Sequence, residues 1–164
     1  MLEQTEGIAI TLSDIASMEA IHLIKARYCR YCDTGQPGEL ADLFSENAIF
    51  DVRAAASIEP PTDGVFAEIG YQVGRKNIRD TIALMLSNLS SSVHHCHMPE
   101  IELTSPTTAK AIWAMEDRIQ LRTGPIKSMH GFGHYHETYI IEDATWRIET
   151  LRLTRLRVDI VPAE

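Results

Sequence analysis

Residues 109–122 read AKAIWAMEDRIQLR and alternate between apolar and polar side chains over most of their length. Successive side chains of a β-strand point to opposite faces of its sheet, so this period of two predicts a strand with one buried face. The predicted buried face carries Trp113, Met115, Asp117, Ile119 and Leu121. The predicted outer face carries Ala114, Glu116, Arg118, Gln120 and Arg122.

Further strands are predicted on both sides of this segment along the chain. Downstream, strands at about Met129–Glu142 and Thr145–Ile160 are joined by a tight turn at Asp143-Ala144. Upstream, residues 48–52 alternate enough for a short strand, and the pattern changes from helix to strand at His94. Strands that follow one another with short connections are typical of an antiparallel meander.

The N-terminal part of the chain shows helical periodicity instead. Between Ser13 and Asp33, apolar residues recur at steps of three and four, and Thr11 or Ser13 can serve as the N-cap. The sequence DTG at residues 33–35 ends this helix because it is typical of a turn. We therefore predict one long first helix.

Two shorter helices are predicted after it. Pro37 suits the first turn of a second helix that ends near Phe44, and a third runs from Arg75 to about Leu89. Residues 54–74 are rich in glycine and proline and show no sustained period, so we interpret them as a long loop or lid.

Helices first and strands afterwards indicate an α+β fold. We expect a cone-shaped, curved antiparallel sheet, covered by the N-terminal helices around an internal pocket. A chain of 164 residues fits one domain, residues 1–164, with a core at about 13–160.

Composition excludes several classes of protein. Apolar residues make up 45% of the chain and charged residues 23%, which is ordinary for a globular protein and unlike a disordered one. A net charge of -8 argues against nucleic-acid binding, since polyphosphate would be repelled. No apolar run approaches the roughly 20 residues that span a bilayer. The acidic start, Met1–Glu6, lacks the features of a signal peptide, so we expect a cytoplasmic protein.

The cysteines do not indicate a disulfide framework, because there are three of them. Cys29 and Cys32 have the spacing of a redox or zinc motif, but they lie within a helical pattern and lack a second pair. We interpret Cys29 and Cys32 as core thiols of the first helix.

Asp117 is the most informative single residue, because alternation places its carboxylate on the same face as Trp113 and Met115. Burial of an unpaired carboxylate costs several kcal/mol, so Asp117 must be paired, protonated or in contact with a wet cavity. An ion pair with an arginine of a neighbouring strand and a slip in the predicted register are the structural alternatives. We predict that Asp117, Trp113 and Met115 line the cavity.

Histidines cluster in two places, and neutral-pH proton transfer is the chemistry for which histidine is best suited. One group is His94, His95 and His97, and the other is His134 and His136. A zinc or iron site is the competing interpretation, but no carboxylate or thiolate at a suitable spacing completes one, so no metal is expected.

The chain resembles the SnoaL-like branch of the nuclear-transport-factor-two-like superfamily, which includes polyketide cyclases, scytalone dehydratase and bile-acid 7α-dehydratase. The resemblance extends from about Met18 to Leu153. It rests on IHLIKARY at 21–28 with Asp33, LFSENA at 43–48, His94 with IEL at 101–103, GHYHE at 133–137, and WRI at 146–148.

The resemblance implies a set of site residues. Tyr28 and Asp33 fall where the dehydratases carry a tyrosine and an aspartate, and His94 falls where they carry the histidine that pairs with that aspartate. Asp117 falls where the bile-acid enzyme has a further acid. Substrate-binding residues are expected among Trp113, Met115, His134, His136, Arg152 and Arg157.

The resemblance also implies an activity and partners. It implies a cofactor-independent dehydratase that abstracts a proton next to a carbonyl of an apolar polycyclic, aromatic or steroid-like substrate. An isomerase or a cyclase would use the same groups, and a non-catalytic binding or assembly domain is the alternative of another class. The expected assembly is a homo-oligomer, a dimer or a trimer, with neither nucleic acid nor membrane as a partner.

Overall fold

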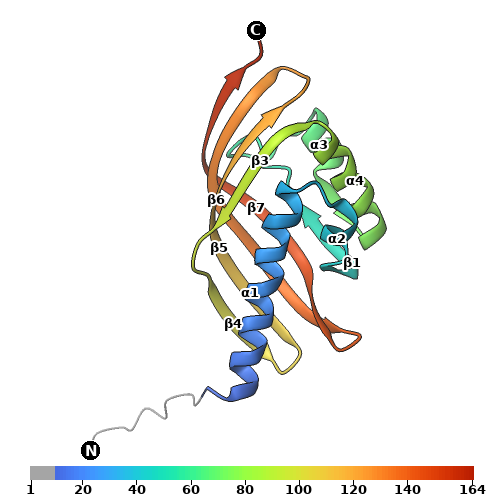
Figure 1. The fold of residues 1–164 in the computed structure, drawn as a ribbon, viewed down its shortest axis with the longest axis vertical. Helices are drawn as coiled ribbons and strands as arrows, with labels where there is room; N and C mark the ends of the chain where they lie inside the picture. The colour runs from blue at the N-terminus through green and yellow to red at the C-terminus, as the bar shows by residue number, and fades with distance from the viewer. Residues whose placement is uncertain (1–9) are drawn as a thin grey trace, which may run out of the picture.

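A computed structural model describes residues 10–164, with four helices and seven strands in that part of the chain (Figure 1). The first helix, α1, spans Leu12–Asp33. Its N-cap is Thr11, whose side chain accepts a hydrogen bond from the Asp14 backbone, while the Asp14 carboxylate accepts one from the Thr11 backbone. This reciprocal capping box stabilises the helix start.

The remaining helices are shorter. They are α2 (Pro37–Ala41), α3 (Val65–Ile69) and α4 (Arg75–Ser87). Pro37 is the first residue of α2. Backbone N–H groups in the first turn of a helix have no partner within the helix, so proline, which lacks an N–H, is favoured there. Within the described residues, no helix combines the length and the apolar character needed to cross a membrane.

The strands form one curved sheet in the order β2-β1-β7-β6-β5-β3, with β4 also paired to β5. Their bounds are Phe44–Asp51 for β1, Tyr71–Val73 for β2, Leu89–Cys96 for β3, Glu100–Ser105 for β4, Thr108–Leu121 for β5, Ile126–Glu142 for β6 and Thr145–Pro162 for β7. The strands β5, β6 and β7 are the longest, and β3 and β4 lie one after the other along β5.

Helix α1 packs along one face of this sheet, which we call the inner face (Figure 1). Burial alternates along β5, as its sequence predicts: Ala109, Ala111, Trp113, Met115, Asp117 and Ile119 are buried. From α1, the residues Ile21, Ile24 and Tyr28 enter the same core. The fold class is therefore confirmed.

The turn between β6 and β7 is also confirmed. Asp143 and Ala144 have φ values of 49° and 57°. Two successive residues with positive φ are characteristic of the type I′ turn, whose twist matches that of the strands it joins. This two-residue turn fixes the register of the β6–β7 hairpin.

Several predicted boundaries and one strand direction are wrong. Strand β1 runs parallel to β7, so the sheet is mixed rather than antiparallel. Strand β3 begins at Leu89 rather than at His94. Its first residues, LSSS, do not alternate between apolar and polar side chains, so the sequence pattern did not reveal the start of the strand. Residues 54–74 contain α3 and β2 and are only partly a loop. The second helix ends at Ala41, before β1 starts at Phe44.

The core position of α1 can be tested with two substitutions of the same type. Ile21 is completely buried and Ile15 is 54% exposed on the same helix. Ile21→Ala is expected to lower the free energy of unfolding by about 2–5 kcal/mol, because it leaves a cavity. Ile15→Ala is the matched control, with an expected change within about 0.5 kcal/mol. Urea unfolding measures both, and equal losses would contradict the described packing of α1.

Candidate active site

The end of α1 meets strand β3 through Asp33 and His94. Asp33 Oδ1 lies 2.6 Å from His94 Nδ1, and Asp33 Oδ2 accepts the His94 backbone N–H at 2.9 Å. The Ser92 hydroxyl also donates to Asp33, at 3.1 Å. The side chain of His94 is only 10% exposed. The carboxylate is therefore held in one orientation against the imidazole.

This geometry determines which ring nitrogen of His94 can act as a base. When Nδ1–H is donated to Asp33, the lone pair is on Nε2, and the carboxylate stabilises the imidazolium that forms when Nε2 takes a proton. The predicted contact between Asp33 and His94 is thus present.

Asp117 lies directly opposite His94 in the β3–β5 register. Its side chain is buried, and its Oδ2 accepts a hydrogen bond from Arg155 at 2.6 Å. The same guanidinium donates to the Ala55 carbonyl at 3.1 Å and contacts the Met115 sulfur at 3.2 Å. Among the described residues, Asp117 Oδ1 has no hydrogen-bond partner. One buried acceptor oxygen, on the strand next to His94, is therefore left unpaired among these residues.

A glycine on β6 allows this ion pair to form. Arg155 belongs to β7, so its side chain must cross β6 to reach Asp117 on β5. Gly131 occupies the crossing point, where a Cβ atom would lie 2.5 Å from the Arg155 guanidinium and 2.6 Å from Asp117 Oδ1. Any side chain at residue 131 would overlap with both charged groups.

A second interior ion pair lies deeper under α1. Lys25 Nζ is 2.6 Å from Glu137 Oε1, and both side chains are buried. Glu137 also accepts a hydrogen bond from the Tyr139 hydroxyl. The oxygen of this hydroxyl accepts a hydrogen bond from the Trp113 indole N–H at 3.1 Å. Sequence reasoning missed this network. Two features of the sequence could have revealed this network. Lys25 lies on the buried side of α1 with Ile21 and Ile24, and Glu137 points to the same side of β6 as buried Tyr139.

Tyr28 lies next to this network. Lys25 Nζ is 4.3 Å from the centroid of the Tyr28 ring and 3.5 Å from that of Tyr135, which makes two cation–π contacts. Burial is the main cause that raises the pKa of Tyr28 well above its usual value, and the nearby Cys32 thiol adds to it. The phenol therefore stays protonated and can act only as a neutral hydrogen-bond donor or acceptor at neutral pH.

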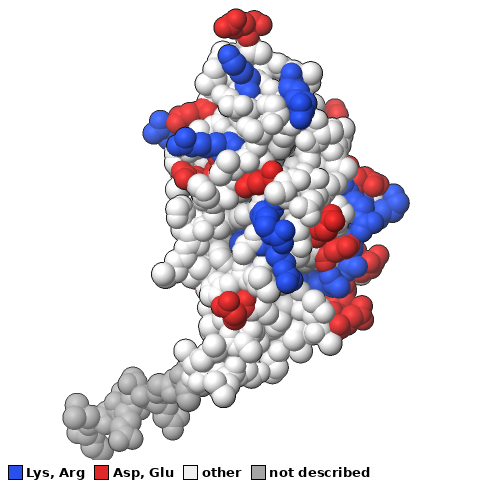
Figure 2. All heavy atoms as spheres, in the orientation of Figure 1, with Lys and Arg blue, Asp and Glu red and all other residues white. Residues whose placement is uncertain are grey.

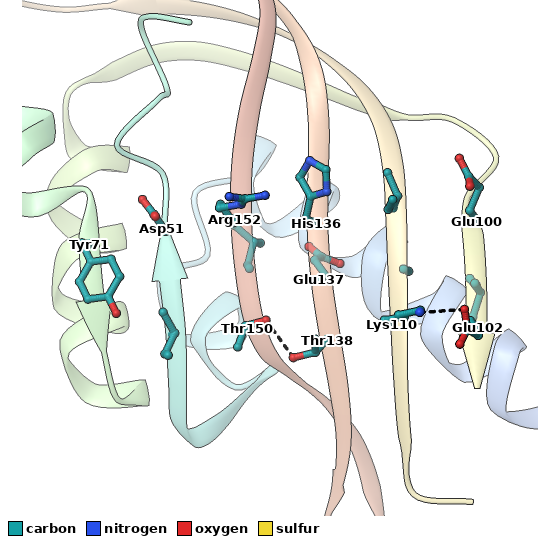
Figure 3. Close-up of a pocket in the computed structure, with 15 residues that line it drawn as sticks. Asp51, Tyr71, Glu100, Glu102, Lys110, His136, Glu137, Thr138, Thr150 and Arg152 are labelled. Atoms are coloured by element: carbon teal, nitrogen blue, oxygen red, sulfur yellow. Dashed lines mark hydrogen bonds and ion pairs between the residues drawn. The ribbon is translucent and has the colours of Figure 1, made fainter. Parts of the chain in front are cut away.

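Of the predicted substrate-binding residues, Trp113 and Met115 lie on the inner face. His134, His136 and Arg152 lie on the other face of the sheet, away from His94. His136 and Arg152 line a groove of about 650 Å³ there, with the helices behind the strands (Figure 3). In this groove, burial lowers the pKa of His136, as does the Arg152 charge. His134, His136 and Arg152 therefore do not share a face with His94, and their role in substrate binding stays a prediction.

The arginine that reaches the interior is Arg155 and not Arg157. Arg157 is 69% exposed and pairs with Asp159. The register between β6 and β7 shifts at Phe132/Gly133, so inward and outward positions exchange there. Beyond a bulge of this kind, counting alternate residues assigns side chains to the wrong face of the sheet. The glycines of GFG at residues 131–133 are the signal in the sequence, since glycine within a strand often marks a bulge or a close approach.

The described residues contain no group of metal-ligating side chains, and one face of the molecule can be inspected for charge in Figure 2. Within residues 10–164, no three His, Cys, Asp or Glu side chains are grouped so that they could hold a metal ion. On the face drawn in Figure 2, acidic and basic side chains are interspersed without an extended patch of one sign. What the site offers is a partly buried acid–histidine pair on the strand next to a second, buried acid.

Comparison with known proteins agrees with the fold. A family model described as a SnoaL-like domain matches residues 13–152. A probable cyclase of Gibberella zeae is 26% identical over 136 residues, which cover 80% of this chain and 86% of the cyclase.

Solved structures show the same architecture. A protein named "Putative Scytalone Dehydratase" from Novosphingobium aromaticivorans superposes with a TM-score of 0.77 at 19% identity, over 94% of both chains. The hexachlorocyclohexane dehydrochlorinase LinA-type3 from Novosphingobium barchaimii superposes with a TM-score of 0.72 at 19% identity, over 93% of both chains.

Gly131→Ala tests the crossing of Arg155 over β6. The added methyl group overlaps with the guanidinium and with Asp117, so the free energy of unfolding is expected to fall by about 3 kcal/mol or more. Gly38→Ala is the matched control, because nothing lies within 4 Å of a Cβ atom there. Thermal unfolding measures both variants, and an unchanged melting temperature for Gly131→Ala would show that Arg155 does not cross at residue 131.

Lys25→Met tests the second ion pair. The substitution leaves the Glu137 carboxylate buried without its cation, and it is expected to cost about 3–5 kcal/mol of unfolding free energy. Adding Glu137→Gln is expected to recover part of this loss, because the neutral amide still accepts the Tyr139 hydroxyl. A double-mutant cycle in urea measures the coupling, and purely additive losses would contradict a direct Lys25–Glu137 interaction.

Proposed function

The chain belongs to the SnoaL-like domain family, and on that premise we propose that it is a lyase or isomerase that abstracts a proton next to a carbonyl group. The reaction we favour is loss of water from a β-hydroxy carbonyl compound, without an organic cofactor or a metal. The substrate class we propose is polycyclic, aromatic or steroid-like, because Tyr28, Trp113, Tyr135 and Tyr139 give the inner face an aromatic character.

The observation that carries the proposal is the 2.6 Å contact between Asp33 and His94. In the proposed reaction, His94 Nε2 takes the proton from the carbon next to the substrate carbonyl. Asp33 holds the ring and stabilises the imidazolium, so that proton transfer needs no rearrangement of the site. Both side chains are partly buried, so solvent screens this electrostatic effect less than it would at the surface.

Two further groups have proposed roles in the same step. The protonated phenol of Tyr28 would donate a hydrogen bond to the carbonyl oxygen as negative charge develops there. Asp117 Oδ1, which has no partner among the described residues, would accept the hydrogen of the substrate hydroxyl and so orient the leaving group. The C–O bond then breaks, and the departing hydroxide takes up the proton from His94 to leave as water.

The names of the relatives support this class of reaction. Dehydratase and dehydrochlorinase both describe eliminations, and each needs a base beside the carbon that loses a proton. The probable cyclase is closer in sequence, and a cyclisation through an enolate would use the same base. Cyclase and isomerase activities therefore remain within the proposal, and proton abstraction is what they share.

His94→Ala is expected to lower turnover by roughly 100- to 10,000-fold, the usual range for a lost general acid or base. His95→Ala is the matched control: it is the next residue of β3, but its side chain is 61% exposed and contacts Glu116. A panel of β-hydroxy ketones on aromatic and steroid-like skeletons is the substrate set. Formation of the conjugated enone is followed by absorbance, and exchange of the α-proton in D₂O is followed by NMR.

The exchange measurement covers isomerases and cyclases as well as dehydratases, because each begins by removing the same proton. Asp33→Asn should lose most of the exchange that His94→Ala loses, since the amide no longer stabilises an imidazolium. Full exchange in His94→Ala would refute the proposed base. Ligands that raise the melting temperature while no wild-type exchange occurs would instead favour a binding domain.

A further inference from the structure

We propose that Cys29 and Cys96 form a peroxide-sensitive thiol pair, which closes to a disulfide that joins α1 to β3. Cys29 lies in α1 and Cys96 is the last residue of β3, and they are 67 residues apart in the sequence. Their sulfur atoms are 3.5 Å apart. The structure therefore pairs Cys29 with a distant cysteine rather than with Cys32, its neighbour in the C-x-x-C spacing.

The geometry allows closure with little movement. A disulfide has an S–S distance of about 2.05 Å, so the two sulfur atoms must approach by roughly 1.5 Å. Side-chain rotation and a small shift of α1 against β3 can provide this. Both side chains are partly exposed, so a small hydroperoxide has access to them. Cys32, by contrast, is buried on the same helix as Cys29.

The surroundings give the two thiols different chemical roles. The hydrogen bond between Cys29 and Cys96, together with the charges of Lys25 and His94, lowers the pKa of Cys29 below its usual value. The same hydrogen bond and burial raise the pKa of Cys96. Cys29 also lies one helical turn after Lys25 on the buried side of α1, and we assign it as the thiolate that attacks first, with Cys96 as the thiol that resolves the product. Burial likewise raises the pKa of Cys32, which keeps its thiol unreactive.

The chemical step balances with a hydroperoxide as the oxidant. The Cys29 thiolate attacks the peroxide oxygen, which gives a sulfenic acid at Cys29 and releases an alcohol, or water from hydrogen peroxide. The Cys96 sulfur then attacks the Cys29 sulfur, the S–O bond of the sulfenic acid breaks, and its hydroxyl group leaves as water with the Cys96 proton. Two thiols lose two electrons and two protons in total, the peroxide gains them, and a dithiol reductant reverses the step.

The position of the pair couples it to the Asp33–His94 contact. Cys29 lies one helical turn before Asp33, and Cys96 follows His94 on the same face of β3. Drawing α1 and β3 together changes the geometry between these two side chains. This consequence, unlike the disulfide itself, rests on the proposed function. Misplacement of catalytic groups by about 1 Å can cost 100-fold, so oxidation is expected to lower turnover by roughly 10- to 100-fold.

The disulfide is tested on the whole reduced protein with a few equivalents of hydrogen peroxide. Intact mass should fall by two hydrogen atoms, and peptide mapping without reduction should recover one Cys29–Cys96 cross-link, with Cys32 still open to alkylation. Cys29→Ser and Cys96→Ser should each prevent the cross-link. Cys32→Ser is the matched control and should keep it. Recovery of a Cys29–Cys32 link, or oxygen addition at Cys29 without any link, would overturn the proposal.

Turnover provides the second measurement and separates the two proposals. Oxidised wild type should lose activity and regain it with dithiothreitol, while Cys96→Ser should keep its activity under the same mild treatment. If the cross-link forms but oxidised and reduced proteins turn over equally, the disulfide stands and its control of the site is refuted. If the cross-link forms and no substrate is turned over at all, the proposed function fails and the thiol pair does not.

Discussion

Two carboxylates point into the interior of this fold from neighbouring strands, and each requires a buried cation within hydrogen-bond reach. A lone charge in the interior would cost several kcal/mol, so Asp117 and Glu137 can be buried only because Arg155 and Lys25 reach them. These cations come from β7 and α1. The two ion pairs therefore fix how the last strand and the first helix lie relative to β5 and β6.

The candidate site depends on the placement of α1 that results. The ion pair between Lys25 and Glu137 holds α1 against β6. Residues that follow Lys25 at steps of three and four lie on the same side of the helix and therefore also face the sheet. Tyr28 lies against Tyr135, Cys29 faces Cys96, and Asp33 ends the helix against His94. One ion pair in the middle of the helix thus sets the register of every α1 group that the proposals use. Asp33 needs no long loop to reach His94, because the helix ends beside β3.

Periodicity predicted the long helix, the three long strands and the buried face of β5, because each has a sustained pattern and one apolar side. It could not predict β3, whose serines do not alternate, or Arg155, because a bulge exchanges the inward and outward positions of β7. The contact between Asp33 and His94 came from the family resemblance, since no local pattern links residues 61 apart in sequence. An arginine partner for Asp117 was among the alternatives, but the bulge concealed that it is Arg155, and the Lys25–Glu137 pair was missed because no local pattern links residues 112 apart in sequence.

The groove lined by His136 and Arg152 and the hydrogen bonds of Asp33 and Arg155 lie on opposite faces of the sheet. In the outer groove, the Lys110–Glu102 pair is more than half exposed, so solvent and side-chain motion weaken it. On the inner face, Asp33 accepts three hydrogen bonds and Arg155 donates to two groups while it contacts a third. Catalysis requires groups that are already held in place before the substrate arrives. The outer groove offers volume, whereas His94 and its neighbours offer hydrogen bonds that are already formed, and our proposal therefore uses the inner face under α1.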